Sequence, residues 1–155
     1  MPPLHNQLIL QAEDDENDII FLKYVFKNAG IPNPLYSVAD GQEVVDYLSG
    51  TGTFGDRVAH PIPTLIFLDL KMPRMGGLDT LRWIRAHPAF RTLAVIMFTA
   101  SASQQDINRA YQLGANSFVI KPAGTEELTT LFMSLHAYWF RCNRFPTISA
   151  IEATS

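Results

Sequence analysis

The sequence predicts an α/β protein with a doubly wound, five-stranded parallel sheet. Five short apolar segments alternate with five segments of helical periodicity along the 155 residues, and this alternation is typical of parallel strands joined by right-handed crossovers. Three of the apolar segments are nearly continuous in Leu, Ile, Val and Phe, which indicates central strands covered on both faces. The predicted strands are Gln7–Ala12, Leu35–Ala39, Thr64–Leu68, Leu93–Phe98 and Ser117–Ile120, of which the first, third and fourth are central.

Helices are predicted where apolar residues recur at spacings of three and four. In the first helical segment Leu22, Val25 and Phe26 follow this spacing, Asp15 is the expected N-cap, and Gly30 stands where the helix ends. This segment also carries more apolar residues than one stripe can hold, namely Ile19, Ile20, Phe21 and Tyr24. Two outcomes stay open for them: an outward-facing surface, or a wide stripe covered by neighbouring loops. The predicted helices are Asp18–Ala29, Gln42–Leu48, Leu78–Ala86, Gln104–Leu113 and Thr125–Arg141.

The last helix and the tail are rich in aromatic residues. Trp139 continues the apolar stripe and is expected in the core. Tyr138, Phe140 and Phe145 exceed what one helix face can bury, and two outcomes stay open for them: burial, or an exposed patch that serves as an interface.

Composition excludes several classes of protein. A hydrophobic share of 47% and a net charge of −3 are those of a chain that folds, not of a disordered one. The single Cys142 excludes a disulfide framework and favours a reducing, cytoplasmic location. No apolar run approaches the roughly 18 residues of a membrane span, no signal peptide is expected at the start, and no basic cluster indicates nucleic-acid binding.

The glycines at 50, 52 and 55 match a dinucleotide-binding motif by letter. Such a motif must leave a strand and open a helix, whereas these glycines follow a helical segment and precede the prolines of Pro61-Ile-Pro63. We therefore interpret residues 50–63 as a flexible surface loop.

Acidic residues end two of the predicted central strands. Glu13 and Asp14 follow the first strand and Asp69 follows the third, while Thr99 and Lys121 end the fourth and fifth. Function gathers at this edge of doubly wound sheets. Clustered carboxylates need a cation, and an all-oxygen set favours Mg²⁺, whereas the four scattered histidines show no zinc-ligand spacing. One carboxylate could then attack a phosphoryl group held by the lysine and hydroxyl.

These residues resemble those of the receiver domain of two-component response regulators over nearly the whole chain. The resemblance rests on Glu13-Asp14, on Asp69 in Leu-Ile-Phe-Leu-Asp69-Leu-Lys-Met-Pro73, on Thr99-Ala-Ser and on Lys121-Pro122. It implies a (βα)5 flavodoxin-like fold of strand order 2-1-3-4-5 and one receiver domain over residues 1–155, with a core of about 6–141, a tail at 142–155 and no output domain.

The resemblance also implies a mechanism. A sensor histidine kinase would phosphorylate Asp69 with Mg²⁺ bound by Glu13, Asp14, Asp69 and the Lys71 backbone carbonyl. Thr99 and Lys121 would then move inward, the aromatic Phe118 would rotate, and the surface of the fourth helix, fifth strand and fifth helix would change. Pro122 corresponds to a cis-proline of the family. Catalysis would be limited to self-phosphorylation and dephosphorylation.

Several expectations concern partners and alternatives. The loop at 50–63 and the aromatic C-terminus are similar to stand-alone receivers associated with bacterial phytochromes, which implies a phytochrome-type kinase. A homodimer through the fourth helix, fifth strand and fifth helix is expected, with no nucleic acid and no membrane as partner. Two alternatives stay open: a degenerate receiver that binds partners unphosphorylated, and a phosphatase of the haloacid dehalogenase type, although the latter needs a second Asp where Lys71 stands.

Overall fold

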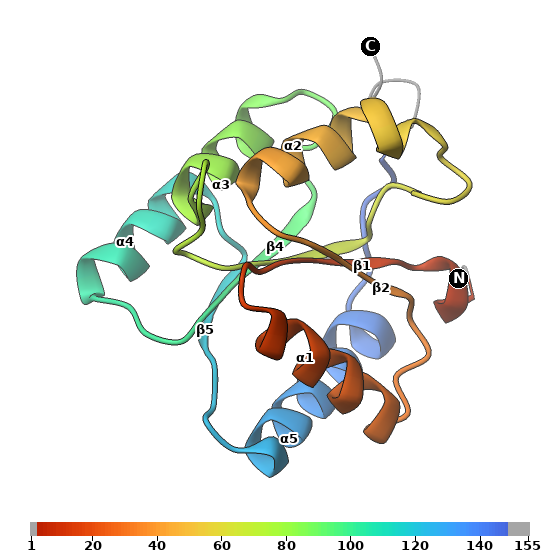
Figure 1. Cartoon of the computed structure of the whole chain (residues 1–155), viewed down its shortest axis with the longest axis vertical. Helices are drawn as coiled ribbons and strands as arrows, with labels where there is room; N and C mark the ends of the chain where they lie inside the picture. Colours follow the sequence, from red (N-terminus) through yellow and green to blue (C-terminus); the bar gives the residue numbers. More distant parts are fainter. Residues whose placement is uncertain (1–2, 149–155) are drawn as a thin grey trace.

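A computed structural model describes residues 3–148 of the chain. Within them five parallel strands form one twisted sheet (Figure 1) of order β2-β1-β3-β4-β5. This order is the one predicted. The strands are β1 (Ile9–Ala12), β2 (Leu35–Val38), β3 (Leu65–Leu68), β4 (Ala94–Thr99) and β5 (Ser117–Ile120). The residues of β1, β3 and β4 are all buried, as expected for central strands.

Helices cover both faces of the sheet, and Figure 1 shows α2, α3 and α4 on one side with α1 and α5 on the other. Each layer has its own apolar core: Tyr47, Leu81 and Phe90 belong to the first, and Phe26 and Phe132 to the second. The helices are α1 (Glu16–Asn28), α2 (Gly41–Ser49), α3 (Gly77–Ala86), α4 (Gln104–Leu113) and α5 (Thr125–His136). No helix in this part of the chain is long and apolar enough to cross a membrane.

The start of α1 confirms the predicted cap. The Asp15 carboxylate accepts hydrogen bonds from the backbone N–H groups of Asn17 at 2.9 Å and Asp18 at 3.4 Å, which satisfies donors that have no partner inside the helix. The surplus apolar residues of this helix do face outward: Ile20 is 65% exposed and Tyr24 is 55% exposed.

The end of the last helix corrects the prediction for the aromatic residues. After α5 the chain forms a π-helical turn, η3 (Ala137–Cys142), whose wider spacing shifts the inward face by one residue. Phe140 is therefore buried at 3% exposure and stacks on His136, whereas Trp139 is half-buried and stacks on Phe145. Tyr138 is exposed. Of the two outcomes left open, burial applies to Phe140, Phe145 is half-buried against Trp139 and Phe140, and Tyr138 alone of the three is exposed.

The segment between α2 and β3 lies at the surface, as predicted, and most of residues 51–59 are exposed, but contacts of Phe54 and Arg57 with the fold hold it more firmly than a flexible loop. A 3-10 turn, η2 (Gly52–Gly55), brings Phe54 onto the rings of Tyr36, Tyr47 and His60. The Arg57 guanidinium donates to the Tyr47 carbonyl at 2.7 Å, in the last turn of α2. A half-buried cation that caps a helix C-terminus holds the segment against α2.

A buried polar contact between α5 and the segments before β1 and β2 lies at the amino ends of the strands. His136, at the end of α5, contacts Asn33 Oδ1 through Nε2 at 2.9 Å, and Asn33 Nδ2 donates to the Gln7 carbonyl at 2.9 Å. Because the amide nitrogen is already the donor to Gln7, the amide oxygen accepts and the imidazole carries its proton on Nε2. Burial, together with the charge of Arg141, lowers the pKa of His136.

Candidate functional site

The strand register brings the predicted site residues to one edge of the sheet. Ala12 pairs with Leu68, so the residues that follow them, Glu13 and Asp69, lie side by side. The Asp69 backbone N–H donates to the Ala12 carbonyl at 3.1 Å, and the Lys121 N–H donates to the Thr99 carbonyl at 2.8 Å. Backbone hydrogen bonds that continue past the strand ends therefore fix the positions of Asp69 and Lys121 at this edge.

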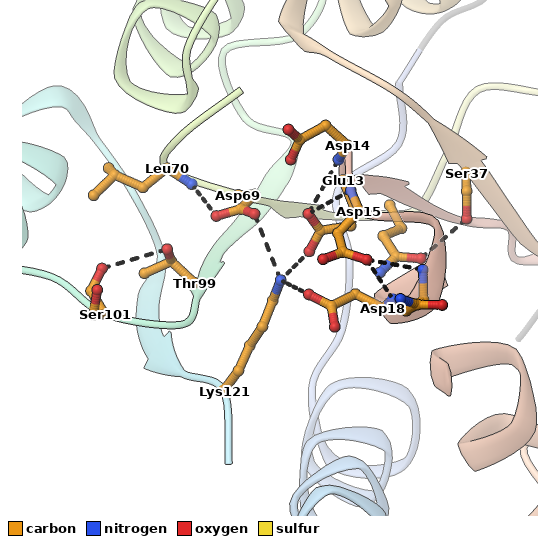
Figure 2. Close-up of polar contacts among 12 residues, drawn as sticks. Glu13, Asp14, Asp15, Asp18, Ser37, Asp69, Leu70, Thr99, Ser101 and Lys121 are labelled. Carbon is orange, nitrogen blue, oxygen red and sulfur yellow. Dashed lines mark hydrogen bonds and ion pairs between the residues drawn. The ribbon is translucent and has the colours of Figure 1, made fainter. Parts of the chain in front are cut away.

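Lys121 is the centre of this edge (Figure 2). Its Nζ atom forms ion pairs with Glu13, with Asp18 Oδ2 at 3.3 Å and with Asp69 Oδ2 at 3.5 Å. The Lys121 side chain is 13% exposed and that of Glu13 is 2% exposed. One buried ammonium thus faces three carboxylates from β1, α1 and β3, and the site carries an excess of negative charge.

Burial and neighbouring charges change the pKa values of Glu13 and Lys121. Burial is the largest cause that raises the pKa of Glu13, and the Asp69 carboxylate raises this pKa further, although the hydrogen bond from Lys121 lowers it. Burial alone would lower the pKa of Lys121, but Glu13, Asp69 and Asp18 together raise it. The lysine is therefore charged at neutral pH, and Glu13 gains from any further cation placed beside it.

The donor set fits a divalent cation. Glu13, Asp14 and Asp69 each offer a carboxylate oxygen, and these oxygens lie within 4.8 Å of one another. Glu13 is buried and Asp14 is exposed, so the group opens to solvent on one side. A cluster of carboxylate oxygens with an open side suits Mg²⁺, which keeps several waters in protein sites.

The Asp69 carboxylate is oriented by the residue that follows it, and the start of α3 lies against the Asp69 backbone. The Leu70 backbone N–H donates to Asp69 Oδ1 at 2.7 Å, which orients the carboxylate toward Lys121 (Figure 2). A side chain at Gly77, the first residue of α3, would overlap the Asp69 carbonyl. Glycine is therefore required at position 77 for the helix to approach the strand end this closely.

The other predicted residues lie around this centre. Thr99 is buried at the end of β4, and its hydroxyl donates to the Ser101 carbonyl at 3.5 Å. Phe118 pairs with Met97 across β4 and β5 and is half-buried on the α2–α4 side. Lys71 is exposed in the loop after β3. The cis form expected at Pro122 is wrong, since no peptide bond within residues 3–148 is cis, in keeping with the general trans preference of prolyl bonds.

Sequence reasoning missed Asp18 as a member of the site. The sequence pattern indicates only that Asp18 begins a helix, whereas in the structure its carboxylate lies in the first turn of α1 and contacts Lys121. It also lines a hollow of about 450 Å³ between α1 and the segment after β5, together with Phe21, Phe98 and Pro122. Its position three residues after the Asp15 cap places it on the first turn, but only the position of α1 beside the segment after β5 brings it to the lysine.

The parallel sheet and the acidic residues at its carboxyl edge agree with a comparison of the chain with known protein families. Residues 9–132 match the family described as response regulator receiver domain, and the chain belongs to that family. Phosphorylation by a histidine kinase is the standard function of its members, and the protein is a two-component signalling protein.

Three solved relatives are similar over nearly their whole length. A response regulator in red light signalling of R. palustris, RPA3017, is 35% identical with a TM-score of 0.86, covering 91% of this chain and 99% of the other. The phosphorylated cyanobacterial phytochrome response regulator RcpA is 26% identical with a TM-score of 0.83 and the same coverage. The Mn²⁺-bound form of Rcp1, from Synechocystis, is 26% identical with a TM-score of 0.81, again with this coverage.

Proposed function

We propose that Asp69 is the phosphoacceptor of this receiver and that Glu13, Asp14 and Lys121 form the site around it. The observation that carries the proposal is the ammonium of Lys121, buried among the carboxylates of Glu13, Asp18 and Asp69 at the carboxyl edge of the sheet. A buried cluster with more carboxylates than cations destabilises a fold unless a further cation neutralises it. The divalent cation that accompanies the phosphoryl group would supply that charge.

The transfer is a substitution at phosphorus. An Asp69 carboxylate oxygen forms a bond to the phosphorus of a phosphohistidine, the phosphorus–nitrogen bond breaks, and its electron pair returns to the imidazole of the kinase. Lys121 supplies a fixed positive charge 3.5 Å from Asp69 Oδ2, where charge accumulates on the phosphoryl oxygens. The product is an acyl phosphate on Asp69, which the same site can hydrolyse.

Mg²⁺ is the cation that the donor set fits. Asp14, Asp69 and the Lys71 backbone carbonyl would hold it directly, with Glu13 acting through water. When bound it would neutralise carboxylate and phosphoryl charge. The Mn²⁺ in the Rcp1 structure supports a divalent ion in this family.

The switch follows from the added charge. An aspartyl phosphate offers acceptor oxygens that draw the Thr99 hydroxyl and the Lys121 ammonium toward Asp69. Movement of Thr99 gives room for Phe118 to turn inward, and because Phe118 lacks a hydroxyl the change is one of packing. Phosphorylation then shifts the population of the α4-β5-α5 surface.

The test is the intact mass of the protein after incubation with acetyl phosphate and Mg²⁺. Wild type is expected to gain one phosphoryl group, and Asp69→Asn or wild type with a chelator is expected to gain none. Asp79→Asn is a matched control, since Asp79 is an exposed aspartate of α3 outside the site. A phosphoryl group on the Asp69→Asn protein would contradict the proposal.

The alternatives are less well supported. A degenerate receiver would have lost acids or the lysine, whereas all of them meet here. A phosphatase of the haloacid dehalogenase type needs a second Asp two residues after the nucleophile as general acid, and Lys71 stands there, exposed. We further propose that residues 1–155 form one receiver domain with self-directed catalysis only, located in the cytoplasm.

A phytochrome-type histidine kinase is the proposed partner. The similarity to RPA3017 and RcpA supports this choice. On this chain Ile20, Phe21 and Tyr24 form an exposed apolar surface of α1 beside the hollow that reaches Lys121, where a phosphohistidine helix would dock. Phosphotransfer from a purified phytochrome kinase that is lost in Ile20→Glu, but retained in the exposed loop variant Val58→Glu, would support it.

We also propose a homodimer through α4, β5 and α5. Tyr111 of α4 is 51% exposed and Ile120 of β5 is 46% exposed, so this face offers apolar area to a second copy. Equilibrium sedimentation at about tens of micromolar, a concentration that populates a dimer with a dissociation constant of about 1 μM, is the test. Only monomer with and without a phosphate mimic would contradict the proposal, whereas a dimer abolished by Ile120→Glu would support it.

A further inference from the structure

The loop between β3 and α3 is tied to the start of α2 by an ion pair outside the acidic site. Arg74 Nε donates to Asp40 Oδ2 at 2.7 Å and its Nη2 donates to Asp40 Oδ1 at 3.1 Å. The Asp40 side chain is 7% exposed and also accepts from the Glu43 backbone N–H at 2.9 Å. Burial alone would raise the pKa of Asp40, but the bonds from Arg74 and Glu43 lower it. The carboxylate is therefore ionised, and the fork of the guanidinium fixes the direction of the contact.

A second contact joins the same two segments. The Gly41 backbone N–H donates to the Met75 carbonyl at 3.0 Å. A side chain at Gly41 would overlap the Thr80 hydroxyl and would lie 2.5 Å from the Met75 carbonyl oxygen. The start of α2 thus lies directly against the loop, and Arg74 reaches across this junction.

The backbone of Arg74 is strained. Its φ of 61° is the single positive value at a non-glycine residue within residues 3–148. Left-handed backbone is costly for an arginine and free for a glycine. A strained residue persists where its surroundings over-determine it, and such residues cluster at functional sites. A glycine would adopt this backbone without strain, but it would lack the side chain that binds Asp40.

The tied loop is the one that follows Asp69. Its base is closed by the Gly77 N–H, which donates to the Leu70 carbonyl at 2.9 Å, and its far side is closed by Arg74 and Met75. Lys71 lies between these ties. We propose that Arg74 is a positioning residue: resting on the proposed function, its ion pair with Asp40 holds the loop so that the Lys71 carbonyl stays available to the cation bound by Asp14 and Asp69.

Electrostatics and positioning predict opposite signs for the loss of Arg74. Removal of the positive charge of Arg74 would tighten cation binding if charge alone acted. Removal of the tie would loosen the loop and weaken binding, as the loss of outer contacts of a metal site does. The direction of the change in affinity therefore separates the two roles.

The experiment is titration calorimetry with Mg²⁺ on the full chain. Arg74→Ala and Arg74→Gly are expected to bind Mg²⁺ roughly tenfold more weakly, and Arg74→Lys to recover part of the loss. Arg82→Ala is the matched control, because Arg82 is a 56% exposed arginine of α3 paired with Asp79, and its affinity should be unchanged or slightly tighter. Arg74→Gly also guards against misfolding, since glycine adopts this backbone without strain.

The outcomes are distinct. Unchanged or tighter Mg²⁺ binding in both Arg74→Ala and Arg74→Gly would overturn the positioning role while leaving the proposed function intact. Wild type that binds no Mg²⁺ would overturn the proposed function, and this inference with it. Weaker binding in both Arg74→Ala and Arg74→Gly, measured at a temperature at which both variants are folded, supports the inference, because a merely structural role would lower the unfolding midpoint and leave the Mg²⁺ affinity of the folded protein unchanged.

Discussion

Two buried polar groups lie at opposite ends of the same strands, and they are built differently. At the amino ends, His136, Asn33 and the Gln7 carbonyl form a neutral chain in which donor meets acceptor. At the carboxyl ends, Lys121 faces the carboxylates of Glu13, Asp18 and Asp69 with charge left over.

The difference separates structure from function. A satisfied neutral network stabilises the fold and needs nothing further. A cluster with excess negative charge destabilises the free protein and is relieved when a cation binds. Substitutions at the two ends should therefore change stability in opposite directions.

The largest expected effect is that of Asp69→Asn. Phosphorylation is expected to be lost entirely, while the free energy of unfolding without Mg²⁺ rises by about 1 kcal/mol. Burial is the largest cause that raises the pKa of Glu13, and the variant removes the further rise caused by the Asp69 carboxylate. Urea unfolding with a chelator measures the second effect. A less stable variant would break the comparison, since it would show the carboxyl edge to be a stabilising network.

The opposite sign is expected for His136→Ala. The substitution leaves Asn33 Oδ1 without its partner and opens space beside Phe140, so the free energy of unfolding should fall by about 2–3 kcal/mol. Phosphorylation of the folded fraction should be unchanged. His5→Ala, at an exposed histidine, is the control. Equal stabilities of the two variants would show the amino-end network to be unimportant.

Mg²⁺ should raise the free energy of unfolding only by binding to the carboxylates at the carboxyl edge of the sheet. At a concentration ten times the dissociation constant, wild type is expected to gain about 1.4 kcal/mol of unfolding free energy from mass action. The gain should be retained in His136→Ala and much reduced in Asp14→Asn, which lacks one of the three clustered carboxylates. Thermal unfolding with and without Mg²⁺ measures it, and a full gain in Asp14→Asn would remove that residue from the site.

The smallest effect is a pH dependence from the amino end. The pKa of His136 is lowered from 6.5 by burial and by Arg141, so below that value the unfolded chain binds a proton that the folded chain resists. Stability contributed by this group is therefore present above about pH 6.5 and is lost as the pH falls below it. Urea unfolding between about pH 7.5 and 5 should show a steeper loss for wild type than for His136→Gln. Parallel curves would contradict the lowered pKa.

Sequence patterns predicted the elements and which strands are central, and the resemblance to receiver domains predicted the order of the strands. They also predicted the residues that end the strands, because functional side chains at the carboxyl edge of a parallel sheet follow directly from the strand positions. Asp69 and Lys121 are examples, since each lies one residue beyond a predicted strand and each is found at the common edge.

Other features could not be predicted because they depend on contacts distant in the sequence. The π-turn that buries Phe140 in place of Trp139 depends on how α5 packs, since periodicity assumes a regular helix. Arg57 lies in a segment rich in glycine and proline, and only its contact with the end of α2 shows that the segment is fixed. Asp18 joined the site by the same kind of long-range contact.

The sequence by itself determined which residues carry charge, which segments are apolar and therefore which strands lie at the centre, because local periodicity and burial preference act along the chain. Only the tertiary structure decided the balance of charge around Lys121 and the tie between Arg74 and Asp40. Both depend on distances between side chains that lie 34 to 108 positions apart, and such distances are set by how helices pack on the sheet.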